Sequence, residues 1–188
     1  MMTRNVWHLI LIIPFTFSSL AAQNPAGGIA FGGTFVNVNC GSTAFGITTP
    51  EGWVSDTTFA HQLGLKSFFY PVRDTASLTA TYFYATGYPK LSDDQNLQKF
   101  VTADLTRYYE NYPDIKQDSI SIDVPSGVIA AKNYIFTGFK KRYGEQTIFM
   151  ESKSAILVII FSAKDEADYR SYLNAFNKFF GTFRLIKN

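Results

Sequence analysis

Cysteine and histidine, which often combine in nucleophilic catalysis, are scarce in this sequence. It contains one cysteine, Cys40, and two histidines, His8 within the first 22 residues and His61 further along. A hydrolase would need Cys40 or a serine within hydrogen-bond reach of His61. No recognisable motif surrounds either residue, so we predict that the protein is not an enzyme. A hydrolase that uses His61 with an unrecognised nucleophile is the alternative.

The sequence predicts neither a metal site nor a cofactor site. A zinc site takes three or four ligands from Cys, His or carboxylates, and Cys40 with His61 does not supply such a set. Asp93 and Asp94 fall at the start of a predicted helix, where carboxylates favour the positive end of the helix dipole. The sequence also has no glycine-rich phosphate loop, dinucleotide fingerprint or Gly-x-Ser-x-Gly elbow.

Aromatic side chains remain as candidates for a ligand-binding site. The chain has 18 Phe, 11 Tyr and 2 Trp. In a predicted strand over 78–87, Tyr82 and Tyr84 point to one face and Phe83 to the other, because side chains alternate along a strand. One set belongs to the core; the other lies under a covering helix, which we favour, or lines a groove for an apolar ligand or peptide. Trp53 is either a core residue, which we favour, or an exposed contact.

The first 22 residues have the three-part layout of a secretory signal peptide. Arg4 precedes an apolar run over 9–15, and residues 19–22 provide the small side chains of a cleavage site. Pro14 interrupts this run, which is shorter than the roughly 18 apolar residues of a membrane span. We therefore predict an exported protein, periplasmic or extracellular, with no transmembrane segment after cleavage. Its lone Cys40 excludes an internal disulfide.

The charge of the chain is nearly balanced, which argues against nucleic acid as a partner. The sequence has 17 Lys and Arg against 15 Asp and Glu, whereas nucleic-acid-binding domains carry a clear basic excess. The densest basic cluster, at 140–142, lies between two predicted strands. We interpret it as a solvated hairpin tip rather than as a contact for an anion or a lipid headgroup.

Periodicity and turn residues predict one domain of the α+β class over 34–188, after a flexible lead-in over 23–33. The apolar run AILVIIF at 155–161 is typical of a central strand that is covered on both faces. Short links between strands favour a mainly antiparallel sheet, so the helices should pack on both of its faces as an α-β-α sandwich. Strands are predicted at 34–39, 45–48, 66–72, 78–87, 119–124, 130–139, 145–152 and 155–161, and helices at 56–63, 92–112 and 165–180.

Two local signals refine these boundaries. A capping box over 92–95 is expected to start the second helix, and Pro113 to end it. The tetrad 49–52, Thr-Pro-Glu-Gly, suits a type I turn with Pro second and Gly fourth.

Two segments carry a resemblance to known proteins. FGITTPEGWVSD (45–56) followed by LGLKSFFYP (63–71) is similar to exported bacterial proteins of unknown function, and GEQTIFMESKSAILVIIFSAKD (144–165) resembles their later block. The order of elements over 34–186 resembles the PsbP-like fold, which is shared by photosystem II extrinsic subunits, a Ran-binding import factor and DcrB-type periplasmic proteins. The resemblance implies a non-enzymatic binding or assembly role and supplies no catalytic motif. At 72–75 the sequence departs from the Gly-Ser-Ser-Trp-like residues of related chains.

We therefore predict an exported, non-enzymatic binding or assembly module of the bacterial envelope. Its partner is expected to be a protein or a small apolar ligand. An envelope hydrolase that uses His61 and a secreted effector-type protein are the alternatives. An uncovered apolar patch of several hundred Å² or a deep aromatic groove would favour the binding module.

Overall fold

The apolar segment AILVIIF lies in the middle of the main sheet, as predicted. The computed structural model describes residues 29–92 and 94–187, so the expected signal peptide over 1–22 lies outside the described residues. Strand β10 (Ala155–Ala163) is buried along its whole length and pairs antiparallel with β6 (Tyr82–Pro89) and β9 (Gly144–Glu151). Because neighbours flank it and other elements cover both faces, the strand is apolar except for Ser162, near its end.

The main sheet has eight strands in the order β1-β4-β5-β6-β10-β9-β8-β7, and each neighbouring pair is antiparallel. A short link joins β9 to β10, as antiparallel neighbours allow, whereas β6 pairs with β10 although a long stretch of chain separates them. The remaining strands of this sheet are β1 (Ile29–Phe31), β4 (Trp53–Asp56), β5 (Ser67–Pro71), β7 (Lys116–Ile120) and β8 (Ala130–Thr137).

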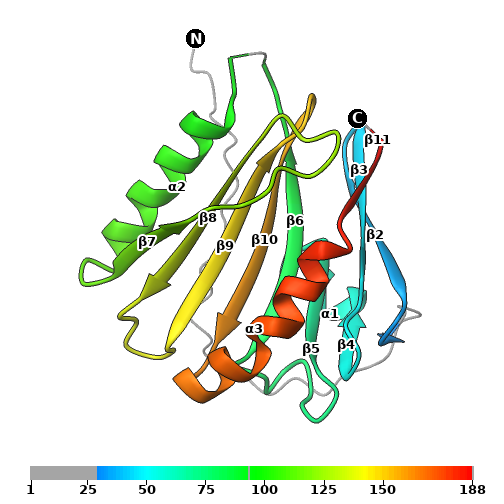
Figure 1. Ribbon diagram of the computed structural model, residues 1–188, viewed down its shortest axis with the longest axis vertical. Coiled ribbons are helices and arrows are strands. Elements are labelled where there is room, and N and C mark those ends of the chain that lie inside the picture. The colour runs from blue at the N-terminus through cyan, green and yellow to red at the C-terminus, as the bar shows by residue number, and fades with distance from the viewer. Residues whose placement is uncertain (1–28, 93, 188) are drawn as a thin grey trace.

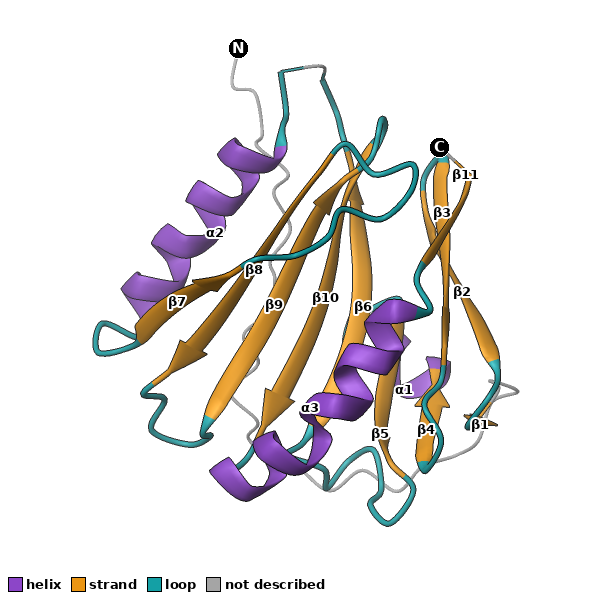
Figure 2. Ribbon diagram, in the orientation of Figure 1, coloured by secondary structure: helices purple, strands orange, loops and turns teal. Residues whose placement is uncertain are grey.

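Helices pack on both faces of this sheet, which confirms the predicted α+β sandwich (Figure 1). Helix α3 (Glu166–Gly181) buries Phe176 and Phe179 against one face. On the other face, α1 (Thr57–Gln62) packs on β4 and β5, and α2 (Leu97–Asn111) packs on β9 and β10. Figure 2 shows α1 and α2 well apart across the width of the sheet.

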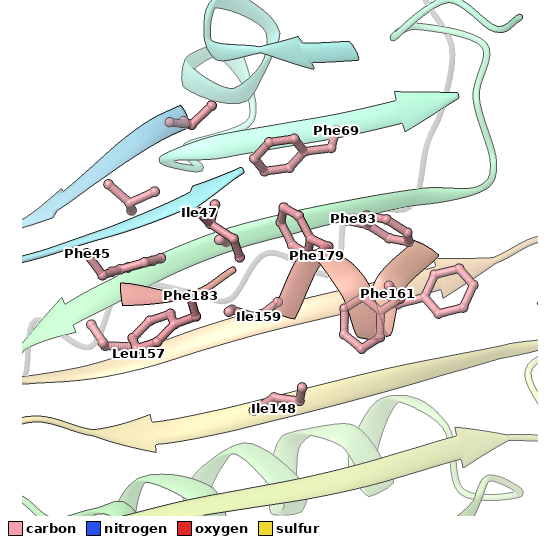
Figure 3. Packing of buried hydrophobic residues seen from close by; sticks show 14 of the residues in the cluster. Phe45, Ile47, Phe69, Phe83, Ile148, Leu157, Ile159, Phe161, Phe179 and Phe183 are labelled. Atoms are coloured by element: carbon pink, nitrogen blue, oxygen red, sulfur yellow. The ribbon is translucent and has the colours of Figure 1, made fainter. Parts of the chain in front are cut away.

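A second, three-stranded sheet shares the α3 face and was not predicted. It has the order β11-β3-β2, formed by β11 (Arg184–Lys187), β3 (Thr43–Thr48) and β2 (Phe35–Cys40). Phe45 and Ile47 of β3 join Phe83 and Phe179 in one hydrophobic core (Figure 3). Helix α3 and the small sheet therefore cover that face of the main sheet together.

Helix α2 begins four residues later than the predicted capping box would have it. Its N-cap is Asn96, whose side chain accepts a hydrogen bond from the Lys99 amide at 3.0 Å. The Leu97 amide donates to the buried Glu151 carboxylate at 2.9 Å, so the first turn is held against the end of β9. Ser92 instead bonds to Asp94 in the preceding loop, so the predicted box is wrong.

Three other predicted boundaries also differ from those in the structure. The turn before β4 is closed by a bond from the Trp53 amide to the Pro50 carbonyl, so Gly52 stands third, with φ of 76°, and not fourth. Glycine adopts a positive φ without the steric cost that a Cβ atom brings, which explains why it occupies this position. Strand β7 starts three residues before the predicted one because Ile115 is buried against Phe136. Within the expected lead-in, Ile29–Phe31 pair with β4 as β1.

Candidate functional site

A groove of about 850 Å³ lies between one flank of α2 and the end of β6. Helix α2 contacts β9 while α1 contacts β5, so β6 lies between the areas that the two helices cover. The groove therefore forms where the cover of this sheet face is incomplete. Its lining comes from β6 and the loop after it, from α2, and from β10: Tyr88, Pro89, Lys90, Ser92, Asp94, Gln95, Asn96, Lys99, Phe100, Ala103, Asp104, Thr106, Arg107, Tyr108, Glu110, Asn111 and Ile156.

Three aromatic residues, Tyr88, Phe100 and Tyr108, lie in the lining of the groove. The rings of Tyr88 and Phe100 lie 5.3 Å apart, and Phe100 also contacts Phe149 of β9. Tyr108 stacks on Phe136 of β8 at 4.7 Å. Burial, and after it the nearby Asp104 carboxylate, raise the pKa of the Tyr88 hydroxyl, which therefore stays protonated at neutral pH.

One carboxylate of the groove is buried. Asp104 lies on α2 with 2% of its surface exposed, and Nη2 of Arg107 donates to its Oδ1 at 2.9 Å. Burial raises the pKa of the Asp104 carboxyl to about 6; the Arg107 guanidinium opposes this shift and Glu145 adds to it. A carboxyl whose pKa is raised at the wall of a groove is typical of functional sites.

A second set of buried charges lies beneath the C-terminal half of α2. Glu145 of β9 is 3% exposed and forms an ion pair with Arg142 at 3.0 Å between Oε2 and Nη2. The hydroxyls of Tyr108 and Thr147 donate to its Oε1. The guanidinium of Arg142 also stacks over the Phe139 ring, 4.0 Å from the centroid. Through Tyr108, these contacts join α2 to β9 of the main sheet.

The basic cluster at 140–142 therefore divides into two parts. Lys140 and Lys141 are exposed, as a solvated hairpin tip requires. Arg142 turns inward, so the interpretation of the whole cluster as solvated is wrong for this residue. Its aromatic neighbour Phe139 and the acidic Glu145 three residues later were the available sequence signals.

Tyr82 and Tyr84 lie on the α1–α2 face of the sheet, half-buried, and Phe83 lies fully buried on the other face. The Tyr82 ring packs on Phe68 of β5 at 5.1 Å, and Tyr84 contributes to the clusters under both helices. Neither tyrosine lines the groove. Tyr88 does, and it continues the alternation of Tyr82 and Tyr84 beyond Gly87, where the predicted strand ended.

Trp53 lies in the core, on the α3 face, and not on the surface. It is 2% exposed and stacks on Phe83 with 3.8 Å between ring centroids, while Tyr172 meets it edge-on. The structure therefore does not bring Trp53 together with Tyr82 and Tyr84.

Cys40 and His61 lie on elements that pack on opposite faces of the main sheet. Cys40 is 1% exposed within the core of the α3 face, and burial raises the pKa of its thiol to about 11. His61 is an exposed residue of α1. The structure thus does not assemble the Cys40–His61 pair that a thiol hydrolase would need.

Across residues 29–92 and 94–187, no group of three or more His, Cys, Asp or Glu side chains is arranged to hold a metal ion. Among the helices of these residues, none is long and apolar enough to cross a bilayer.

The fold defines the chain as a protein of PsbP-like architecture. It is similar to the solution structure of cyanobacterial PsbP (CyanoP) from Synechocystis sp. PCC 6803, with a TM-score of 0.52 and 11% sequence identity. The likeness covers 88% of this chain and 98% of that chain. No protein-family model matches the chain, and no curated protein does either. The predicted PsbP-like fold is confirmed, while the resemblance to DcrB-type exported proteins stays a prediction.

Proposed function

We propose that this protein is an exported, non-enzymatic binding module of the bacterial envelope that holds a small apolar ligand in the groove beside α2. The observation that carries the proposal is the groove itself, about 850 Å³ with Tyr88, Phe100 and Tyr108 in its lining. Small-molecule sites are typically concave, of roughly 300–1,000 Å³, and lined by aromatic and apolar side chains with a few polar groups.

The placement of the other candidate residues agrees with binding rather than catalysis. The Cys40 thiol is buried with its pKa raised to about 11, which disfavours the reactive thiolate. His61 and Cys40 lie on elements that cover different faces of the sheet. The hydrolase alternative therefore gains no support from the arrangement of these side chains.

The test is to fill the groove and measure the binding of a neutral apolar probe. Ala103 is an exposed lining residue on α2, so Ala103→Trp places an indole in the groove without disturbing the helix backbone. Thr102, the preceding exposed residue, is not among the lining residues, and Thr102→Trp is the matched control. The probe is N-phenyl-1-naphthylamine, whose fluorescence rises in an apolar environment.

We expect the wild-type protein and Thr102→Trp to bind the probe with equal affinity, and Ala103→Trp to bind it at least about tenfold more weakly. Equal binding by all three proteins, or none by the wild type, would contradict the proposal.

Export is tested separately by cell fractionation. We expect the processed protein, without residues 1–22, in the periplasmic extract. Recovery mainly from the culture medium would favour the secreted effector, and retention of the unprocessed chain in the cytoplasm would contradict export.

A further inference from the structure

The groove beside α2 combines aromatic walls with one deeply buried negative charge. Among its lining residues, Asp104 has the most buried charged side chain, with 3% of it exposed. Tyr88 and Phe100 form a ring pair in the lining, and Tyr108 follows Asp104 by one turn of α2. A carboxylate beside aromatic rings is the arrangement that recognises organic cations, because ring faces carry negative electrostatic potential.

The positive side chains of the groove are already engaged and lie nearer to solvent. Lys90 pairs with Glu151 at 2.5 Å, and Lys99, 62% exposed, pairs with Asp94 at 3.0 Å. Within each pair the two charges neutralise each other, so neither lysine offers an excess positive charge to an anionic ligand.

The Asp104 carboxylate lies close to the aromatic part of the lining. It is the most buried of the charged lining side chains, and after burial, which contributes most, it raises the pKa of Tyr88. A positively charged occupant therefore complements this part of the groove.

Arg107 is the residue that neutralises Asp104 in this structure. Its guanidinium reaches Asp104 through Nη2, while 39% of the side chain is exposed. Its Nε is buried without a hydrogen-bond partner. A half-exposed arginine can turn into solvent, where its charge is well hydrated, and this movement would leave Asp104 free for another cation.

We propose that the groove takes a small organic cation with an apolar chain, whose ammonium group replaces Arg107 at Asp104 while its chain lies against Tyr88 and Phe100. This inference rests on the proposed function, since it names the ligand class of the same groove. Asp104 is then the residue that determines specificity, and Arg107 is a removable internal counter-ion.

The experiment compares three probes that share an eight-carbon chain: octylammonium, octanol and octanoate. Each is titrated at pH 7.5, below its micelle concentration, into the mature protein labelled with ¹⁵N. Amide chemical shifts locate the bound probe and give its dissociation constant. Residues of α2 and the end of β6 are expected to shift.

Four variants separate the roles of the two charged residues. Asp104→Asn removes the charge, and Arg107→Gln removes the internal competitor. The double variant removes both, so that neither group is left buried without its partner. Asp118→Asn is the matched control, because Asp118 is an exposed carboxylate on β7, outside the groove.

For the wild type, we expect octylammonium to bind at least about tenfold more tightly than octanol or octanoate, because it makes a charge-assisted hydrogen bond. Asp104→Asn and the double variant should lose this preference while they still bind octanol. Arg107→Gln should bind octylammonium more tightly than the wild type, and Asp118→Asn should match the wild type.

The outcomes distinguish this inference from the proposed function. Binding of octanol or octanoate as tight as that of octylammonium, or an unchanged preference in both Asp104 variants, would overturn only the cation assignment. If none of the probes shifts α2 or β6, the proposed function fails as well. A lysine tripeptide that binds more tightly than octylammonium would overturn the small-molecule assignment. Concentration-dependent shifts at α2 without any probe would assign the groove to a second copy of the chain.

Discussion

The sulfur of Cys40 occupies the space that a side chain at Gly87 would need. A Cβ atom built on Gly87 would lie 2.2 Å from Cys40 Sγ and 3.0 Å from Leu157 Cδ2. Because of this close approach, β2 of the small sheet packs directly on β6 of the main sheet. Gly87 is therefore required for the two sheets to pack.

We predict that Gly87→Ala destabilises the protein by about 1–3 kcal/mol, because the added methyl group overpacks this contact. Gly181→Ala is the matched control: the last residue of α3 has open space around its Cα, so the substitution is expected to be neutral or slightly stabilising. Urea unfolding followed by circular dichroism measures both changes. Combining Gly87→Ala with Cys40→Ala should recover part of the loss; equal stability of the two glycine variants would contradict the packing argument.

The same burial predicts that the Cys40 thiol is unreactive in the folded protein. The side chain is 1% exposed and its pKa is raised to about 11, so little thiolate forms at pH 8. We expect 5,5′-dithiobis(2-nitrobenzoic acid) to label Cys40 only as fast as the protein unfolds, and at once in concentrated urea. Rapid labelling without urea would show an accessible thiol and revive the nucleophile alternative.

Local signals in the sequence were sufficient for the layers of the fold. The apolar run of β10 and the 3.6-residue periodicity of α3 are properties of single segments, and both elements are found where they were predicted. Strands β1 and β11 were missed because each has three or four residues and depends on a partner far along the chain.

The groove could not be predicted because it is defined by what covers each part of the sheet. Tyr88 belongs to the same alternation as Tyr82 and Tyr84, yet only Tyr88 lines the groove. The difference arises from the positions of α1 and α2 across the sheet, which no segment encodes by itself. Likewise, Arg142 and Glu145 become a buried pair only when α2 closes over them.

The N-cap of α2 gives a prediction that separates the observed helix start from the predicted one. Asn96→Ala removes the bond to the Lys99 amide and is expected to cost about 1 kcal/mol. Ser92→Ala is the matched control, because Ser92 is exposed and lies before the helix; it should change stability by less than about 0.5 kcal/mol. Thermal unfolding compares the two, and a larger loss for Ser92→Ala would place the start at the capping box after all.

Asp104 predicts a defined dependence of stability on pH. The pKa of its carboxyl is about 6 in the folded protein against an ordinary value of 3.8, with burial as the main cause. The folded state therefore holds this proton more tightly than the unfolded chain. The stability that this contributes is complete below the unfolded pKa and is lost as pH rises from there through about 6.

The measurement is the free energy of unfolding between pH 4 and 7.5 for the wild type, Asp104→Asn and the exposed control Asp118→Asn. We expect the stability of Asp104→Asn relative to the wild type to improve as pH rises across this range. The relative stability of Asp118→Asn should stay nearly constant. A parallel pH dependence of the wild type and Asp104→Asn would show that the buried carboxyl does not titrate in this window.

Arg142 and Glu145 predict a large loss when one partner is removed and a recovery when both are. The side chains are 19% and 3% exposed, so Arg142→Gln leaves the Glu145 charge buried without its counter-ion. We expect a cost of about 3–5 kcal/mol for this variant. Lys141→Gln, the exposed neighbour, should stay within about 0.5 kcal/mol of the wild type.

The double variant Arg142→Gln with Glu145→Gln tests the cause of that loss. If the cost comes from an unpaired buried charge, the neutral pair should be more stable than Arg142→Gln alone. If it comes instead from the lost packing of the guanidinium over the Phe139 ring, the double variant should be at least as unstable as the single one. Urea unfolding at pH 7.5 distinguishes the two results. Recovery would assign the inward turn of Arg142 to the neutralisation of Glu145 beneath α2.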